Sequence, residues 1–223
     1  MSTVKAADIN VKTVTISPPN LVTALFHIVG EDNTDYCQHK FSAKAQRLIR
    51  EKQEAGSTAK KGAKREARDF AQDCKDATYL SKEGWYGIPA PAFRNACISA
   101  CRLCGFKMTI AKMTVFVIAD GVDAETGKPL VRITKGKPRD TTDYVRLETG
   151  VCSITARPKW ATWEADVRIR FDADQFKLED VTNLLSRAGM QVGIGEGRPD
   201  SPNSAGQGWG TFRIASHKEI ATT

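Results

Sequence analysis

Hydrophobic and polar residues alternate most regularly in the segment 162–172, TWEADVRIRFD. Its odd-numbered positions from Trp163 to Phe171 are apolar. The positions between them carry two acids and then Arg168 and Arg170. A strict period of two is typical of a strand with one buried and one polar face. We therefore predict a strand that directs both arginines away from the core.

Shorter apolar or alternating runs predict further strands along the chain. Such runs occupy residues 10–17, 21–30, 112–120, 130–134, 143–150, 152–158 and 210–215.

Two segments have the helical period instead. In 90–105 the apolar stripe consists of Phe93, Ala96, Cys97, Ala100, Cys101 and Cys104, and Gly105 is expected to end the helix. In 178–189 it consists of Leu178, Val181, Leu184, Leu185 and Ala188, with Gly189 as the expected end.

The order of these elements predicts the fold class. A strand, a helix, several antiparallel strands, a second helix and a last strand follow one another, which is the order of a split βαβ unit. We predict one α+β domain over residues 1–223, with a ferredoxin-like or RRM-like antiparallel sheet. Two helices would cover one face of the sheet and leave the other for a ligand.

The segment 34–78 interrupts this order. It contains two runs of strong helix formers with few apolar anchors, joined by GSTAKKG, and we predict a basic helical protrusion. Between Lys40 and Lys82, lysines and arginines exceed acids by six, close to the net charge of +7 for the whole chain. This concentration favours contact with a polyanion over the alternative of a solvated charged surface.

A glycine-rich stretch lies near the C-terminus, VGIGEGRPDSPNSAGQGWGTFRI. Glycines such as Gly193, Gly195 and Gly197 let backbone N–H groups converge on an anion. Arg198 adds a bidentate donor, and Trp209 a ring on which a base could stack. We predict a phosphate-binding loop over 193–210; the alternative is a long hairpin loop with no ligand.

Two further motifs have the spacing of cofactor sites but not the structural setting that such sites require. Cys97, Cys101 and Cys104 have the C-x3-C-x2-C spacing of radical-SAM enzymes, but those enzymes present it on a loop. Here the cysteines share a helical apolar stripe, where free cysteine packs as a small hydrophobe. The GIGEG segment lacks the preceding strand and the following helix of a dinucleotide fingerprint. We therefore predict no metal and no other cofactor.

The chain carries no membrane signal in its sequence. No stretch approaches the roughly 20 apolar residues that span a bilayer. The N-terminal MSTVKAADINVKTV lacks the apolar region of a signal peptide. We expect a cytoplasmic location, in a bacterial or phage-infected cell, with six reduced cysteines and no membrane partner.

Two motifs together resemble a known superfamily. GIPAPAFRNACISACR, followed much later by AGMQVGIGEGRPDSPNSAGQGWGTFRI, is similar to the RAMP superfamily, the RRM-fold RNA-binding proteins of CRISPR effector complexes. The nearest likeness is to the backbone subunit, which polymerises along guide RNA and carries an insertion at the place of 34–78. The ending also resembles a group of bacteriophage proteins. The resemblance implies that Arg94 and Asn95 lie near nucleic acid, together with the glycines of the loop and Arg198.

These observations predict a non-enzymatic protein that binds single-stranded nucleic acid, with RNA favoured over DNA. It would self-associate or form a subunit of a nucleoprotein complex. Bases would stack on Trp85 or Trp209. Phosphates would be bound by the cationic residues Lys60, Lys61, Lys64, Arg65, Arg68, Arg168, Arg170 and Arg198.

Two alternatives remain open from the sequence. One is a metal-independent endoribonuclease of the same fold with His27 as general base. The other is a protein-interaction module, such as a phage inhibitor, whose protrusion would dock on a host protein.

Overall fold

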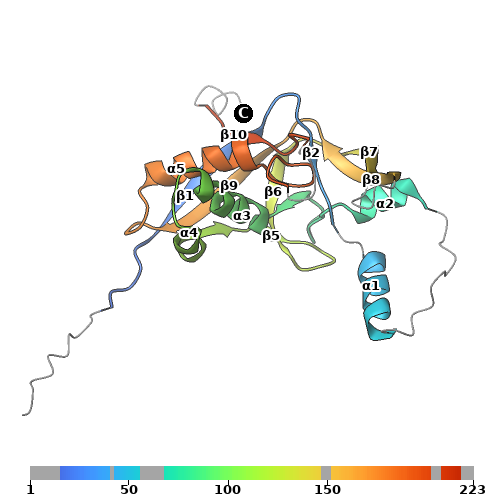
Figure 1. Cartoon of the computed structure of the whole chain (residues 1–223), viewed down its shortest axis with the longest axis horizontal. Helices are drawn as coiled ribbons and strands as arrows, with labels where there is room; N and C mark the ends of the chain where they lie inside the picture. The colour runs from blue at the N-terminus through green and yellow to red at the C-terminus, as the bar shows by residue number, and fades with distance from the viewer. Residues whose placement is uncertain (1–15, 41–42, 56–67, 147–151, 202–206, 217–223) are drawn as a thin grey trace, which may run out of the picture.

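The computed structural model describes residues 16–40, 43–55, 68–146, 152–201 and 207–216. This part of the chain is α+β, with antiparallel sheets and five α-helices (Figure 1). Its elements, in chain order, are β1 (Leu21–Gly30), β2 (Tyr36–Cys37), α1 (Ala43–Ala55), α2 (Phe70–Asp76), β3 (Gly87–Pro89), α3 (Ala90–Ala100), η2 (Cys101–Leu103), α4 (Met108–Thr114), β4 (Val115–Ile118), β5 (Gly121–Val122), β6 (Pro129–Lys135), β7 (Arg139–Arg146), β8 (Cys152–Trp160), β9 (Glu164–Asp172), α5 (Leu178–Arg187), the π-helical turn η3 (Ala188–Val192) and β10 (Phe212–Ile214).

The main sheet is built around β9. Its strands follow the order β10-β1-β9-β6-β3, β4 also pairs with β9, and β5 pairs with β6. Every one of these pairings is antiparallel. The alternation predicted for 162–172 is confirmed, because Trp163, Val167 and Phe171 are buried while Arg170 is exposed.

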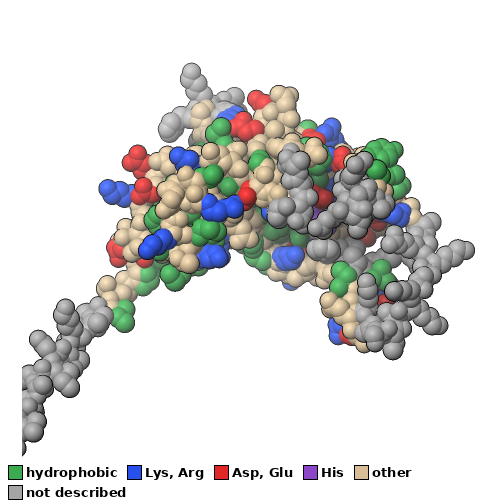
Figure 2. All heavy atoms as spheres, in the orientation of Figure 1, with side chains coloured by type: hydrophobic (Ala, Val, Ile, Leu, Met, Phe, Trp, Pro, Cys, Tyr) green, Lys and Arg blue, Asp and Glu red, His purple; other side chains and the backbone are tan. Residues whose placement is uncertain are grey.

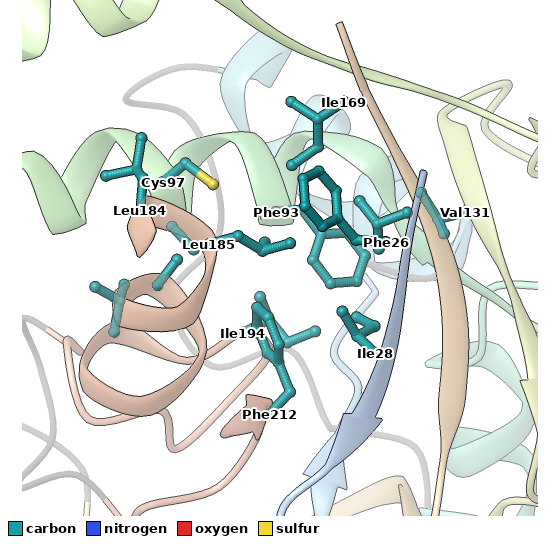
Figure 3. Close-up of a cluster of buried hydrophobic side chains, with 14 of the residues drawn as sticks. Phe26, Ile28, Phe93, Cys97, Val131, Ile169, Leu184, Leu185, Ile194 and Phe212 are labelled. Atoms are coloured by element: carbon teal, nitrogen blue, oxygen red, sulfur yellow. The ribbon is translucent and has the colours of Figure 1, made fainter. Parts of the chain in front are cut away.

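Helices cover one face of this sheet. In Figure 1, α3, α4 and α5 lie together over β1 and β9. Figure 3 shows the core beneath them, where Phe93 of α3 and Leu185 of α5 meet Ile28 of β1 and Phe212 of β10. All four side chains are fully buried, and each contributes roughly 2 kcal/mol through removal of apolar surface from water.

A second, three-stranded sheet has the order β2-β8-β7. Tyr36 pairs with Trp160 across β2 and β8, and both rings are buried. Helix α2 packs against β8 and buries Cys74. The prediction of a single sheet is therefore incomplete, because the two-residue strand β2 pairs with β8, which lies far along the chain.

The predicted protrusion over 34–78 includes parts of the body of the protein. Helix α1 stands away from the sheets in Figure 1, and its described side chains are exposed. By contrast, Tyr36, Cys37 and Lys40 are buried, and α2 packs on the second sheet. Residues 41–42 and 56–67 lie outside the described residues.

Two of the predicted strands differ in the structure. Residues 10–15 of the predicted strand 10–17 are not described, and 16–17 form no strand. The strand predicted over 112–120 begins only at β4, because Met108 and Ala111 place an apolar face of the two-turn helix α4 on the core.

The second predicted helix does not end at Gly189. The chain continues through η3, and a Cβ on Gly189 would lie 2.0 Å from the carbonyl oxygen of Phe212. Glycine at this position is therefore needed for the close approach of β10, not as the end of the helix.

The cysteine-containing stripe is packed as predicted except at its end, where Cys104 is exposed. Cys97 and Cys101 are buried in the core, and burial raises the pKa of the Cys97 thiol to about 12. All six cysteines are free thiols. Among the described residues, no group of three or more His, Cys, Asp or Glu side chains could hold a metal ion. In the same part of the chain, no helix is long and apolar enough to cross a membrane.

Candidate functional site

A cleft of about 410 Å³ lies between α3 and the loop that follows η3. Its first wall is the polar side of α3, with Asn95 and Ser99. The opposite wall is the loop from Gly193 to Ser201, and the remaining wall includes Tyr36, Gln38, His39 and Tyr79. The cleft is large enough to enclose a unit of the size of one nucleotide.

The glycines of the loop fit it tightly against neighbouring elements. Gly193, Gly195 and Gly197 all have positive φ values, between 70° and 79°, which favour glycine. A Cβ on Gly195 would lie 2.4 Å from the carbonyl oxygen of Cys37, and one on Gly197 would lie 2.4 Å from the ring of Trp209. The fold itself therefore requires these glycines.

Two backbone donors of this loop lack an acceptor within the described part of the chain. Ile194 N–H donates to Gly210, and Glu196 N–H donates to Cys37. The N–H groups of Gly195 and Gly197 donate to no described residue. They are the backbone groups that an anion bound at the loop could use.

Three side chains of the cleft retain donors for a ligand. Among the described residues, the amide of Asn95 and the hydroxyl of Ser99 have no hydrogen-bond partner. The Arg198 guanidinium donates one hydrogen bond, of 3.1 Å, to the carbonyl oxygen of Gly195. No carboxylate of the described residues pairs with Arg198, so its charge is available to a ligand.

The two acids of the cleft, in contrast, are each paired with an arginine. Arg157 Nε donates to Glu196 Oε2 over 2.8 Å, and Arg102 donates to Asp200. With Arg198, three arginines stand against two carboxylates around the cleft. The cleft therefore carries a small positive excess.

His39 adds no charge to this balance at neutral pH. Burial and the neighbouring Arg157 lower the pKa of His39 below its usual 6.5, although Glu196 acts in the opposite direction. Its Nδ1 lies 3.7 Å from Glu196 Oε2. The imidazole therefore contributes a polar, neutral wall.

The structure brings five of the predicted residues to this cleft: Asn95, Gly193, Gly195, Gly197 and Arg198. Lys60, Lys61, Lys64 and Arg65 lie outside the described residues. Arg68 lies on the second sheet, where it pairs with Asp73 and donates to the carbonyl oxygen of Ile154.

Arg94 lies on another side of α3 from Asn95. Its guanidinium donates to the carbonyl oxygens of Val115 and Lys112, and lies over the ring of Phe116. These bonds satisfy the last turn of α4 and the start of β4. Arg94 therefore joins these elements instead of lining the cleft.

The two tryptophans predicted to stack on bases are both engaged by the protein. Trp85 donates to Glu83 and packs against Gly87 and Gly121. The ammonium of Lys159 lies 3.5 Å from the centre of the Trp209 ring. A base could stack on that face of Trp209 only if Lys159 moved away.

Arg168 and Arg170 lie on the sheet face opposite the helices. Arg168 pairs with Asp120, whereas Arg170 has no closer partner among the described residues than the hydroxyl of Thr23, at 3.5 Å. The same face exposes Leu25 and Phe116, at 65% and 41%. These residues form a second surface, which we call the sheet face, separate from the cleft.

His27 also lies on the sheet face. Its Nδ1 is 2.7 Å from Asp166, and its Nε2 is 3.4 Å from Glu164. A general base needs a free nitrogen near the substrate hydroxyl. An imidazole engaged by carboxylates at both nitrogens does not favour the endoribonuclease alternative.

The polar residues of the cleft that the sequence did not indicate include His39, Ser99, Glu196 and Asp200. Ser99 follows Asn95 by one helical turn, a spacing that could have indicated a shared face. The two acids stand inside the glycine-rich stretch, and their arginine partners are distant in sequence.

On the face of the molecule shown in Figure 2, lysines and arginines are interspersed with acids.

Searches against protein-family models and against curated proteins found no match for this chain.

Proposed function

We propose that this protein binds single-stranded nucleic acid, with RNA favoured over DNA, and that the cleft holds a sugar–phosphate unit of the strand. One observation carries the proposal. Asn95 and Arg198, about a hundred residues apart in sequence, line a single cleft and both keep donors that no described residue uses. Phosphate oxygens are the acceptors that such amide and guanidinium donors prefer.

Electrostatics supports the same proposal. Both acids of the cleft are neutralised by arginines, and Arg198 is left in excess. The chain carries a net charge of +7, which raises the local concentration of any polyanion. Each phosphate that is neutralised releases counterions, so affinity should fall steeply with salt.

The proposal also includes the topology of the main sheet. We infer a ferredoxin-like unit formed by β1, α3, β4, β9, α5 and β10. In its support, β10, β1, β9 and β4 are neighbours in that order, with antiparallel pairing throughout. The resemblance to the RAMP superfamily and self-assembly along a strand remain predictions that accompany it.

The test is fluorescence anisotropy with labelled RNA and DNA of mixed sequence, about 30 nucleotides long, at about 50 mM salt. Wild-type protein should bind. Arg198→Gln and Asn95→Ala should each weaken binding about tenfold, as expected for loss of one charge-assisted or bidentate contact. Arg187→Gln is the matched control, because Arg187 is exposed and lies outside the cleft.

Absence of binding to either polymer by the wild-type chain would overturn the proposal. If Arg187→Gln and Arg198→Gln weakened nucleic-acid binding equally, the cleft would not be the binding site. Co-purification with a host protein after nuclease treatment would favour the protein-interaction alternative.

A further inference from the structure

The cleft is unusual for an anion site because two carboxylates line it. Glu196 Oε2 accepts from Arg157, and Asp200 Oδ2 accepts from Arg102. Glu196 Oε1 and Asp200 Oδ1 have no hydrogen-bond partner within the described part of the chain. The side chains of Glu196 and Asp200 are 34% and 33% exposed, so both can reach a ligand.

These free acceptors restrict what the cleft can hold. A phosphodiester group offers only acceptors, and carboxylate oxygens repel it. A ligand that pairs with Arg198 and with one of these two acids must carry an anionic group and a hydrogen-bond donor. A cleft of about 410 Å³ also requires that the two groups lie close together.

A ribonucleotide unit meets this requirement, because its 2′-hydroxyl lies on the sugar next to the phosphate. The exocyclic amines of bases are also donors, but they lie at the far side of the base. Deoxyribose lacks the 2′-hydroxyl, which is the group by which proteins distinguish RNA from DNA at a given site.

We propose that one of the two free carboxylate oxygens, that of Glu196 or that of Asp200, accepts a hydrogen bond from a ribose 2′-hydroxyl in the cleft and so selects RNA over DNA. The inference rests on the proposed function, since it assigns the class of nucleic acid to the same site. Arg157 and Arg102 hold the two carboxylates in place, and each leaves one oxygen for the sugar.

The experiment compares three strands of one sequence: RNA, DNA and 2′-O-methyl RNA. Anisotropy should show RNA bound about tenfold more tightly than the other two, which corresponds to one hydrogen bond to a charged acceptor. The methylated strand retains ribose geometry but has lost the donor. It therefore separates hydrogen bonding from the shape of the strand.

Glu196→Gln and Asp200→Asn remove the charge and keep the size of the side chain. At least one of them should reduce the preference for RNA several-fold without weakening DNA binding. Asp120→Asn is the matched control, because Asp120 is also paired with an arginine but lies on the sheet face. It should leave the preference unchanged.

The outcomes separate the two proposals. Equal binding of all three strands by the wild-type chain would overturn the 2′-hydroxyl inference and the preference for RNA, and would leave the binding of single-stranded nucleic acid standing. A preference for RNA that survives in both cleft variants would also overturn it. Failure to bind any strand would overturn the proposed function, and this inference with it.

Discussion

The cleft and the sheet face both carry charged side chains, but these differ in how far the protein itself satisfies them. On the sheet face, Arg168 pairs with Asp120 and His27 contacts Asp166, and Arg170 alone of these three has no carboxylate partner among the described residues. In the cleft, Asn95, Ser99 and Arg198 keep donors that no described residue accepts, apart from one bond to a backbone carbonyl. Exposed charge is therefore a poor guide to a binding site unless its partners are known.

The two regions also differ in which residues of the fold are needed to form them. The alternation of β9 already places Arg168 and Arg170 on the sheet face, whereas the cleft needs a loop held by glycines against Cys37 and Trp209. Substitutions should therefore affect the two regions very differently.

The largest effect is expected at Gly210. A Cβ there would lie 1.7 Å from the carbonyl oxygen of Ile194, at a φ of 68°. Gly208 has a φ of 74° but open space around it, so it isolates the backbone strain. By chemical denaturation, Gly210→Ala should lose about 4 kcal/mol of unfolding free energy and Gly208→Ala about 1 kcal/mol. Equal losses would show that the contact with Ile194 does not hold the loop.

The neighbouring residues Arg94 and Asn95 should separate stability from binding. Arg94→Ala removes the bonds to Val115 and Lys112 and should lower the unfolding free energy by about 2 kcal/mol, with RNA affinity nearly unchanged. Asn95→Ala should weaken RNA binding and leave the unfolding free energy nearly unchanged. Weaker RNA binding by a stably folded Arg94→Ala protein would place Arg94 at the nucleic acid after all.

Substitutions of Arg198 and Arg170 compare the cleft and the sheet face directly. Arg198→Gln should weaken RNA binding about tenfold and reduce the salt slope by about one. Arg170→Gln should change affinity by no more than about twofold, as a distant charge would. The measurement is anisotropy at several salt concentrations. A larger effect at Arg170 would move the site to the sheet face.

The pH dependence of stability should report on His39. Its pKa is lowered in the folded chain, so the unfolded chain takes up the proton first, near its usual 6.5. Stability should therefore be complete above that value and fall as the pH drops below it. Denaturation of His39→Gln should show a shallower fall. An unchanged fall would assign the effect to other groups.

The smallest effect is expected for His27→Ala in a nuclease assay. Because both nitrogens of His27 contact carboxylates, labelled RNA should remain intact with the wild type and the variant alike. Cleavage by the wild type that is lost in His27→Ala would restore the endoribonuclease alternative.

Much of the main sheet could be predicted, because its patterns are local. The period of two in β9 and the helical stripe from Phe93 to Cys101 each identify a buried face within one segment. Helix α4 was missed because two turns offer too few positions to show a period. The second sheet was missed because β2 has only two residues and pairs far along the chain with β8.

The candidate site was predictable only in part. The resemblance placed Asn95 and Arg198 together, but it also included Arg94, which points to β4. The roles of Glu196 and Asp200 depend on Arg157 and Arg102, which only the folded chain brings beside them. No local pattern carries that information.

Hydrogen–deuterium exchange of the wild-type protein, with and without saturating RNA, tests the central claim most directly. We expect RNA to slow exchange in the peptides that cover 92–99 and 193–201, and to cause no change in 164–172. Protection confined to 164–172 and its neighbouring strands would contradict it, because the strand would then lie on the sheet face and not in the cleft.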